Sequence, residues 1–227
     1  MTARYLATVR YDASGYSIAA SQHEALTAGK AQRMNIPAMK HAWLICLTLA
    51  TAVCAAQDKT CRDISFPGHV QVNGNELKLN GLGVRKATFL KVNVYVAALY
   101  VVQPQHDPKL LIESDTPQQL VLHFVRNVSV EDLRKGFTEG FERSSAGQSA
   151  PLAARIAKLN SWMSDVQSGW QVLFNRLPHA GVQVSVNGVP RGTIEGDDFS
   201  RALMSIWLGA TPPNPELKSG LLGGECS

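Results

Sequence analysis

Residues 79–101 place polar and charged side chains inside the most apolar part of the chain. The segment begins with a glycine-rich turn and one arginine, Arg85, and continues into an apolar stretch that also carries Asn93 and Tyr95. A buried polar group without a hydrogen-bonding partner costs free energy, so polar groups in such a setting are usually paired or face a cavity. We therefore expect this segment to form the wall of a pocket.

The first 56 residues differ in kind from the rest of the chain. Residues 1–38 show no sustained apolar periodicity, whereas Met39, Lys40 and His41 lead into the apolar run 42–56. A basic start, an apolar run of this length and small residues at its end are typical of a secretory signal peptide. We predict a non-native or disordered extension over 1–38 and a signal peptide over 39–56.

Two other interpretations of this run are open. It could be a buried helix, or Cys54 could be a lipid-attachment site, although residues 51–53 are bulkier than such a site favours. The run is too short to span a bilayer comfortably. We expect a single mature domain over 57–227, periplasmic or secreted, with no stable membrane span after cleavage.

The charge balance changes when this leader is removed. Residues 57–227 contain 17 Lys and Arg against 16 Asp and Glu, a net charge of +1. No basic run is interleaved with aromatic residues, as a surface that follows a phosphate backbone would require. We therefore predict no nucleic-acid partner.

Two cysteines remain in the mature part, Cys61 near its start and Cys226 near its end. In an oxidising compartment such a pair suggests one disulfide that joins the termini. Closing so long a loop would stabilise the fold by about 4–5 kcal/mol in the chain-entropy account. Two free thiols are the alternative, because pairing cannot be read from sequence.

Short apolar stretches and turn residues predict the secondary structure. The expected strands cover 69–72, 76–82, 89–102, 119–125, 170–177 and 181–186, and the expected helices follow Ser129 and cover 151–166, 198–208 and 215–222. Asn73-Gly74-Asn75 has the composition of a hairpin turn, and Ser129 with Asp132 forms a capping box. Strands grouped apart from helices predict an α+β fold, a largely antiparallel sheet covered on one face by helices.

Three stretches, 79–101, 196–209 and 215–223, resemble the chalcone isomerase-like family. The resemblance is to the bacterial exported branch rather than to the plant enzymes, and it spans most of residues 65–223. It implies an open-faced β-sandwich, with an antiparallel sheet, a layer of helices and a cleft between them. In relatives that cleft either cyclises a flavonoid precursor or holds a fatty acid.

The resemblance also bears on catalysis. Plant isomerases place Arg, Thr, Tyr and Asn around the substrate, and the matching residues here are Arg85, Tyr95, Leu133 and Gly140. Only the arginine is kept. In the plant enzymes this arginine faces the oxyanion that develops on the substrate. Leu133 cannot donate to a ketone, so we expect little chalcone cyclisation. We expect Leu133, Phe137 and Gly140 to line the pocket.

The pair Arg85 and Tyr95 resembles that of the fatty-acid-binding members, in which the two side chains grip a carboxylate. A guanidinium offers a planar fork for carboxylate oxygens, and a hydroxyl completes the hydrogen bonding. We predict Arg85, Tyr95 and Asn93, on the same strand face, as ligand contacts. Ten residues of continuous strand would separate Arg85 from Tyr95 by about 33 Å. A shared ligand therefore requires a bend or bulge near residues 86–88.

Simpler roles are open for each of these residues. Arg85 could be a surface residue or an ion-pair partner, Tyr95 a packing aromatic, and Asn93 a satisfied sheet residue. For Leu133 and Phe137 the simpler role is packing in the hydrophobic core, and lining the pocket is a second role.

The sequence gives little support for a metal site, a nucleotide-binding site or a serine-hydrolase site. The histidines of the mature part (His69, His106, His123 and His179) lack metal-ligand spacing, and no nucleotide-binding or serine-hydrolase motif is present. We predict no metal and no cofactor. The favoured function is a non-catalytic binding or carrier protein for a small apolar acid, fatty-acid-like. The alternative is an isomerase, an intramolecular lyase acting on an enone or chalcone-like substrate, and a weaker one is a structural export partner without a ligand.

Overall fold

The structure, a computed structural model, describes residues 57–87, 90–145 and 149–227. All of these residues belong to one compact unit. The predicted extension over 1–38 and the predicted signal peptide over 39–56 lie outside the described residues. Among the helices that are described, none has the length and apolar character needed to cross a membrane.

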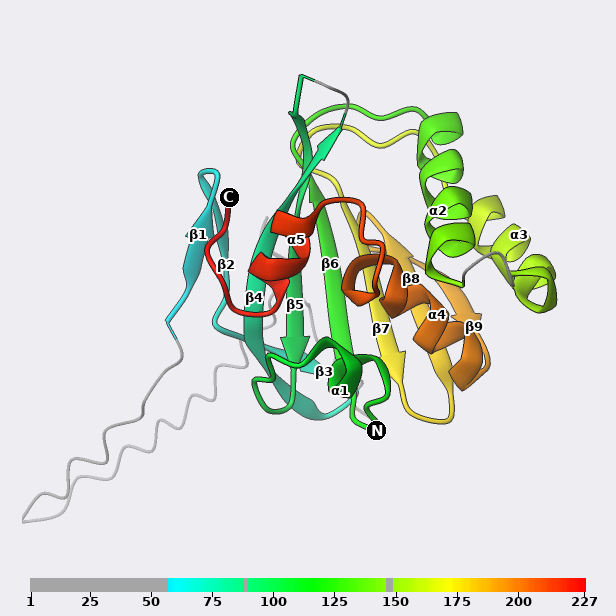
Figure 1. The fold of residues 1–227 in the computed structure, drawn as a ribbon, viewed down its shortest axis with the longest axis horizontal. Coiled ribbons are helices and arrows are strands. Elements are labelled where there is room, and N and C mark those ends of the chain that lie inside the picture. The colour runs from blue at the N-terminus through cyan, green and yellow to red at the C-terminus, as the bar shows by residue number, and fades with distance from the viewer. Residues whose placement is uncertain (1–56, 88–89, 146–148) are drawn as a thin grey trace, which may run out of the picture. The chain divides into compact units, whose positions relative to one another are not determined.

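A seven-stranded antiparallel sheet forms the centre of the fold (Figure 1). In spatial order its strands are β3 (His69–Val72), β4 (Asn75–Ala87), β5 (Val92–Val101), β6 (Gln118–Phe124), β7 (Gln171–Leu177), β8 (Gly181–Val186) and β9 (Val189–Ile194). Spatial order follows chain order, so each strand pairs with its neighbour in sequence. A separate hairpin is formed by β1 (Lys59–Cys61) and β2 (Ile64–Phe66).

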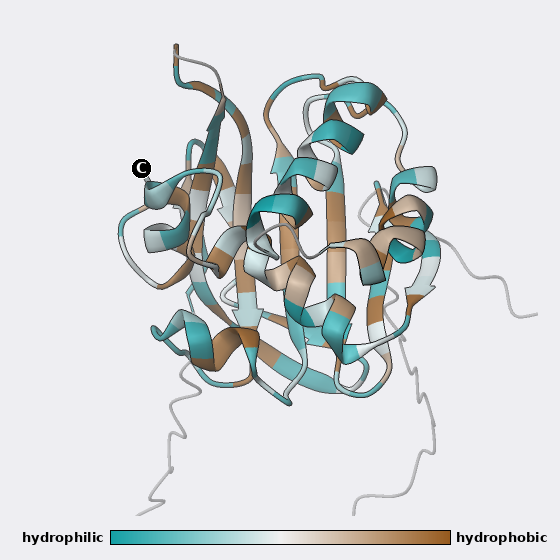
Figure 2. Cartoon of the chain, turned by 45° about the vertical axis from the view of Figure 1, so that its right-hand side comes forward, coloured by the Kyte–Doolittle hydropathy of each residue, from teal (hydrophilic) through white to brown (hydrophobic). Residues whose placement is uncertain are grey.

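Helices form a layer over one face of this sheet (Figure 1). They are α1 (Pro108–Ile112), α2 (Val130–Ser144), α3 (Ala153–Ser161), α4 (Asp197–Leu208) and α5 (Pro215–Leu221), with a 3-10 turn at Ala150–Leu152. The larger core lies between them and the sheet, and Figure 2 shows hydrophobic stretches of the strands behind the helices. Ser129 caps α2 as predicted, since its side chain accepts from the Asp132 N–H at 3.2 Å. The predicted α+β fold is confirmed.

The stretch 79–101 is two antiparallel strands rather than one continuous strand. β4 ends at Ala87, the chain reverses, and β5 begins at Val92, so that Arg85 and Tyr95 become direct cross-strand partners. The separation of about 33 Å that a continuous strand would impose therefore does not arise. The chain does change direction between the two residues, as a shared ligand requires, but the change is a full reversal between Ala87 and Val92 rather than a bend within one strand.

Two Asn-Gly turns join neighbouring strands; the sequence analysis predicts the first of them and omits the second together with strand β9. Asn73 and Gly74 have φ values of 48° and 80° and join β3 to β4, as the sequence predicts. Asn187 and Gly188 have φ values of 49° and 75° and join β8 to β9 in the same way. Positive φ at both central residues is the geometry that hairpin turns of this kind need. The sequence prediction omits β9 because its proline and glycine interrupt the apolar alternation, which is tolerated at a sheet edge.

A bulge at Asn80 decides which face of β4 each side chain meets. The pairing of β4 with β5 shifts between Leu79 and Gly81, and such a shift moves all later residues to the other face of the sheet. Gly81, Gly83 and Arg85 consequently face the helical layer. Without the bulge, Arg85 would lie on the opposite face.

α5 lies directly against β4 because glycines meet at the contact. A Cβ atom at Gly81 would overlap the Gly220 carbonyl oxygen, and one at Gly83 would overlap the Leu217 carbonyl oxygen. A Cβ atom at Gly220 would in turn overlap the carbonyl oxygen of Leu82. This is why the sequence carries glycine at alternate positions just before Arg85.

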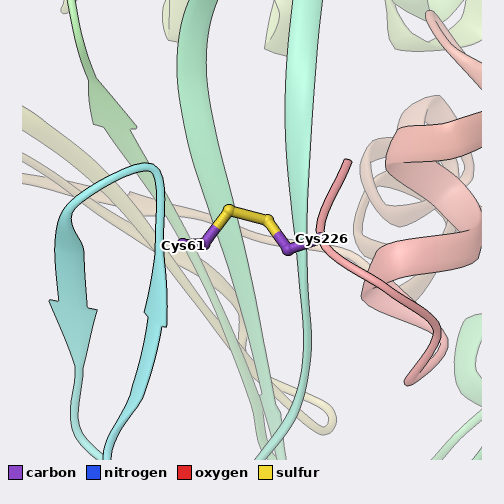
Figure 3. The surroundings of a disulfide bond; sticks show 2 residues. All are labelled: Cys61 and Cys226. Carbon is purple, nitrogen blue, oxygen red and sulfur yellow. A yellow bond between two sulfur atoms is a disulfide. The ribbon is translucent and has the colours of Figure 1, made fainter.

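A second, smaller core occupies the opposite face of the sheet. The β1–β2 hairpin contributes Cys61 and Phe66, which pack with β4 and β5 residues such as Val84 and Tyr100. Cys61 is disulfide-bonded to Cys226, with Cα atoms 6.0 Å apart and a sequence separation of 165 (Figure 3). The predicted disulfide is thus present and ties the hairpin to the tail that follows α5.

The glycine contact gives a direct stability test. We expect Gly83→Ala to lower the free energy of unfolding by about 3 kcal/mol, because the new methyl group meets backbone atoms that cannot rotate away.

Gly136→Ala is the matched control. Gly136 is an exposed residue inside α2, and a Cβ atom there would meet no other atom within 4 Å, so alanine should stabilise by about 0.5–1 kcal/mol. Urea unfolding followed by circular dichroism measures both. Equal midpoints for Gly83→Ala and the wild type would contradict the close contact.

Candidate functional site

A cavity of about 500 Å³ opens between the sheet and the helical layer, at the end where β4 gives way to β5. Its walls come from β4, β5, β6, the loop after β6, α2 and α4. The apolar lining residues include Val94, Leu122, Phe124, Leu133, Phe137, Ile206 and Trp207. The charged ones are Arg85, Arg126, Asp132, Lys135, Glu139 and Arg143. A largely apolar cavity of this size with a few polar groups is typical of small-molecule sites.

Of the six residues predicted for the site, Arg85, Tyr95, Leu133 and Phe137 line this cavity. Arg85 and Tyr95 are direct partners across the β4–β5 ladder, so their Cα atoms lie about 4.5–5.5 Å apart. The structure therefore brings together the two residues that the sequence pairs on one ligand.

Asn93 does not share the cavity face with Tyr95, and this expectation is wrong. Tyr95 pairs with Arg85 but Asn93 pairs with Lys86, so β5 carries one extra residue, Val94, between them. The bulge turns Asn93 to the opposite face, where it borders a separate open depression. Val94 lines the cavity instead.

Gly140 lies outside the cavity lining as well. It is buried at the contact of α2 with α4, where a Cβ atom would come within 2.9 Å of the Ile206 side chain. The glycine thus allows the two helices to approach, rather than shaping the pocket wall. Ile206 itself reaches the cavity.

Tyr95 is a neutral hydrogen-bond donor at the cavity wall. The Trp207 indole donates to the Tyr95 hydroxyl oxygen at 2.9 Å, and the Tyr95 ring packs edge-on against Phe124. Because the hydroxyl oxygen accepts this bond, its own proton remains to be donated elsewhere. Burial raises the pKa of Tyr95 above its ordinary value of 10, although the Trp207 bond and the nearby charges of Arg85 and Arg143 oppose the rise. The hydroxyl therefore keeps its proton at neutral pH.

Arg85 is held by neutral acceptors. Its Nη1 donates to the Asn214 side-chain oxygen at 3.1 Å and to the Lys86 carbonyl oxygen. None of the ion pairs formed among the described residues involves Arg85. Its guanidinium is thus oriented without being neutralised by a carboxylate.

The charged residues that line the cavity carry a net positive charge. Among its lining residues four cations (Arg85, Arg126, Lys135 and Arg143) face two acids (Asp132 and Glu139). Glu139 is already shared, with its carboxylate 3.9 Å from Lys135 and 3.5 Å from Arg143. A cavity lined with an excess of one charge attracts ligands of the opposite charge.

Sequence reasoning missed three residues that build this site. Trp207 has the spacing of a buried helix residue, which gives no sign of its bond to Tyr95. Arg143 lies on α2 among exposed charges, and Asn214 precedes α5 in a proline-rich loop. Trp207 and Asn214 have no local signal, because their partners lie 112 and 129 residues away in the chain, and Arg143 has no feature in the sequence that separates it from the other charges of α2.

This arrangement suits binding of an anion with an apolar body. Arg85 and Tyr95 supply donors at one place, and aromatic and aliphatic side chains form the remaining wall. Leu133 adds only an apolar side chain to the cavity wall, and Gly140 lies at the contact with α4. In the described part of the chain, no three His, Cys, Asp or Glu residues are grouped so as to hold a metal ion.

Comparison with known proteins identifies a family and a solved structure of similar fold. A family model described as chalcone isomerase-like matches residues 58–223. The crystal structure of a fatty-acid binding protein from Arabidopsis thaliana is similar, with a TM-score of 0.58 and 16% sequence identity, covering 70% of this chain and 92% of that one. At that identity the likeness establishes the fold alone. The comparison with curated proteins gives no match. Because the family model covers most of its length, the chain belongs to the chalcone isomerase-like family.

Proposed function

We propose that this protein is a non-catalytic binding or carrier protein for a small apolar acid, such as a fatty acid. The observation that carries the proposal is the facing pair Arg85 and Tyr95 on the wall of one largely apolar cavity. Both side chains present donors, and neither is occupied by a carboxylate of the described residues.

The carboxylate of such a ligand fits the polar part of the cavity, and its alkyl chain fits the apolar part. A carboxylate would accept from the guanidinium nitrogens of Arg85 and from the Tyr95 hydroxyl, and hydrogen bonds to a charged group contribute about 1.5–3 kcal/mol. The alkyl chain would lie against residues such as Leu122, Phe124 and Phe137. Burial of that chain contributes about 25 cal/mol per Å² of apolar surface.

The likeness in fold to a fatty-acid binding protein also supports this proposal. The open cavity weighs against a purely structural export partner, for which a closed or filled cleft is expected. The isomerase alternative has Arg85 and Tyr95 as carbonyl-polarising groups, but Leu133 offers no donor where the plant enzymes have one.

Replacing Arg85 should separate anionic from neutral ligands. We expect Arg85→Gln to weaken binding of sodium dodecanoate by about 10-fold or more, because a charge-assisted contact is lost. Binding of dodecan-1-ol should change by less than about two-fold, since its tail contacts remain. Isothermal titration calorimetry on delipidated protein measures both.

Arg191→Gln is the matched control for this experiment. It removes the same charge from an exposed position on β9 that does not line the cavity. Equal dodecanoate affinity in Arg85→Gln and Arg191→Gln would remove the support for a carboxylate grip, and a wild-type protein that binds no alkyl acid would refute the proposal.

An absorbance assay with a panel of chalcones and enones addresses catalysis. We expect no rate above the uncatalysed background for the wild type, because Leu133 cannot donate to the ketone. Turnover by the wild type that disappears in Arg85→Gln would favour the isomerase instead.

We also propose that the protein is exported, which the Cys61–Cys226 disulfide supports because such bonds persist in oxidising compartments. Protein isolated from the periplasm or medium should begin near Ala56 or Gln57, with the leader removed. Non-reducing digestion should yield a peptide pair joined through Cys61 and Cys226. Recovery only as full-length, reduced protein from the cytoplasm would contradict export.

A further inference from the structure

We infer that Asn214 is the positioning residue of the anion site, which orients Arg85 while leaving its positive charge available to the ligand. This inference rests on the proposed function and extends it: Asn214 makes the cavity select an anionic head group over a neutral one.

Asn214 makes two bonds to the end of β4 through one atom. Its Oδ1 accepts from Arg85 Nη1 at 3.1 Å and from the backbone N–H of Lys86 at 2.8 Å. The backbone bond fixes where the amide oxygen lies relative to the strand. The guanidinium bond then fixes where the Arg85 side chain points, toward the cavity that it lines.

Asn214 lies at a position where its side chain would be expected to cap a helix, so its bonds to β4 are unusual. Asn214 is the N-cap residue of α5, where an asparagine side chain ordinarily accepts from a backbone N–H in the first turn of its own helix. Here the side chain makes no such capping bond. Its oxygen is directed to Arg85 and Lys86 instead.

Asn214 is itself held in place from both sides. After it, α5 is seated against β4 by the contacts of Gly81, Gly83 and Gly220. Before it, the loop from α4 is tied to α2 by the Thr211 hydroxyl, which donates to the Arg143 carbonyl oxygen at 3.0 Å. The acceptor for Arg85 is therefore a fixed point.

A neutral acceptor is what the site needs at this point. The same chain shows the effect of a carboxylate partner at Arg155, whose Nη1 and Nη2 donate to the two oxygens of Asp198 at 2.7 and 2.6 Å. That arrangement occupies the guanidinium fork and lowers the pKa of Asp198 to about 2. A carboxylate at residue 214 would compete with the ligand for Arg85 in the same way. An amide oxygen orients Arg85 without that competition.

The variant Asn214→Asp tests whether the neutrality of the acceptor matters, because it keeps the acceptor and adds a negative charge beside Arg85. Aspartate has nearly the same shape and keeps an acceptor for both bonds, so the melting temperature should not fall. Dodecanoate affinity at pH 7.5 should fall by about 10-fold or more, the scale of one charge-assisted contact. Dodecan-1-ol affinity should stay within about two-fold, because the apolar wall is unchanged. A merely structural role would change stability or alter both ligands alike.

Two further variants keep the result decisive. Asn187→Asp adds the same charge at an exposed turn outside the cavity and should retain wild-type dodecanoate affinity. Asn214→Ala, which covers the case in which Asn214→Asp does not fold, removes the acceptor without adding charge. It should weaken dodecanoate binding by about 3- to 10-fold, the range of one neutral hydrogen bond.

The outcomes separate this inference from the proposed function. A wild type that binds dodecanoate, together with an Asn214→Asp or Asn214→Ala variant that binds it equally well, overturns the inference and leaves the proposed function standing. A wild type that binds dodecan-1-ol but no dodecanoate overturns both.

Discussion

The close contact between the backbones of β4 and α5 determines how the rest of the site is arranged. Gly81 and Gly83 bring the helix against the strand with no side chain between them. The helix begins at a fixed height above β4, so Asn214 lies beside Arg85 and Lys86. A spacing defined by backbone atoms is rigid, because backbone cannot rotate away as a side chain can. The contacts of Gly81 and Gly83 with α5 thereby place the residue that orients Arg85.

Arg85 and Tyr95, the facing pair on the cavity wall, are held in the same way. Each is fixed by a neutral partner: Arg85 by the amide of Asn214, and Tyr95 by the indole of Trp207. In both cases the partner fixes the side chain and leaves its capacity to donate for a ligand. Groups held in this way lose little further freedom when a ligand binds, which favours affinity. This arrangement suits holding an anion, and Leu133 contributes only an apolar side chain to the same wall.

Local patterns predict most of the fold but only part of the site. The Asn73-Gly74 turn and the Ser129 cap depend on neighbours in sequence, and both are confirmed. The sequence pattern places Asn93 on the wrong face because strand alternation carries no sign of the extra residue at Val94. Trp207 and Asn214 could not be found, since their partners lie 112 and 129 residues away.

The sequence by itself determined the α+β class, the family, the pair Arg85 and Tyr95, and the cysteines able to join the termini. The α+β class follows from periodicity and turn chemistry, which are local properties of a chain, whereas the family and the pair Arg85 and Tyr95 follow from the resemblance of three stretches to known proteins. Only the tertiary structure decided that β4 and β5 are two paired strands, and that a bulge at Asn80 turns Arg85 toward the helices. The reason is physical: the face that a strand residue occupies depends on the register of its partner strand, and a shift of one residue reverses it.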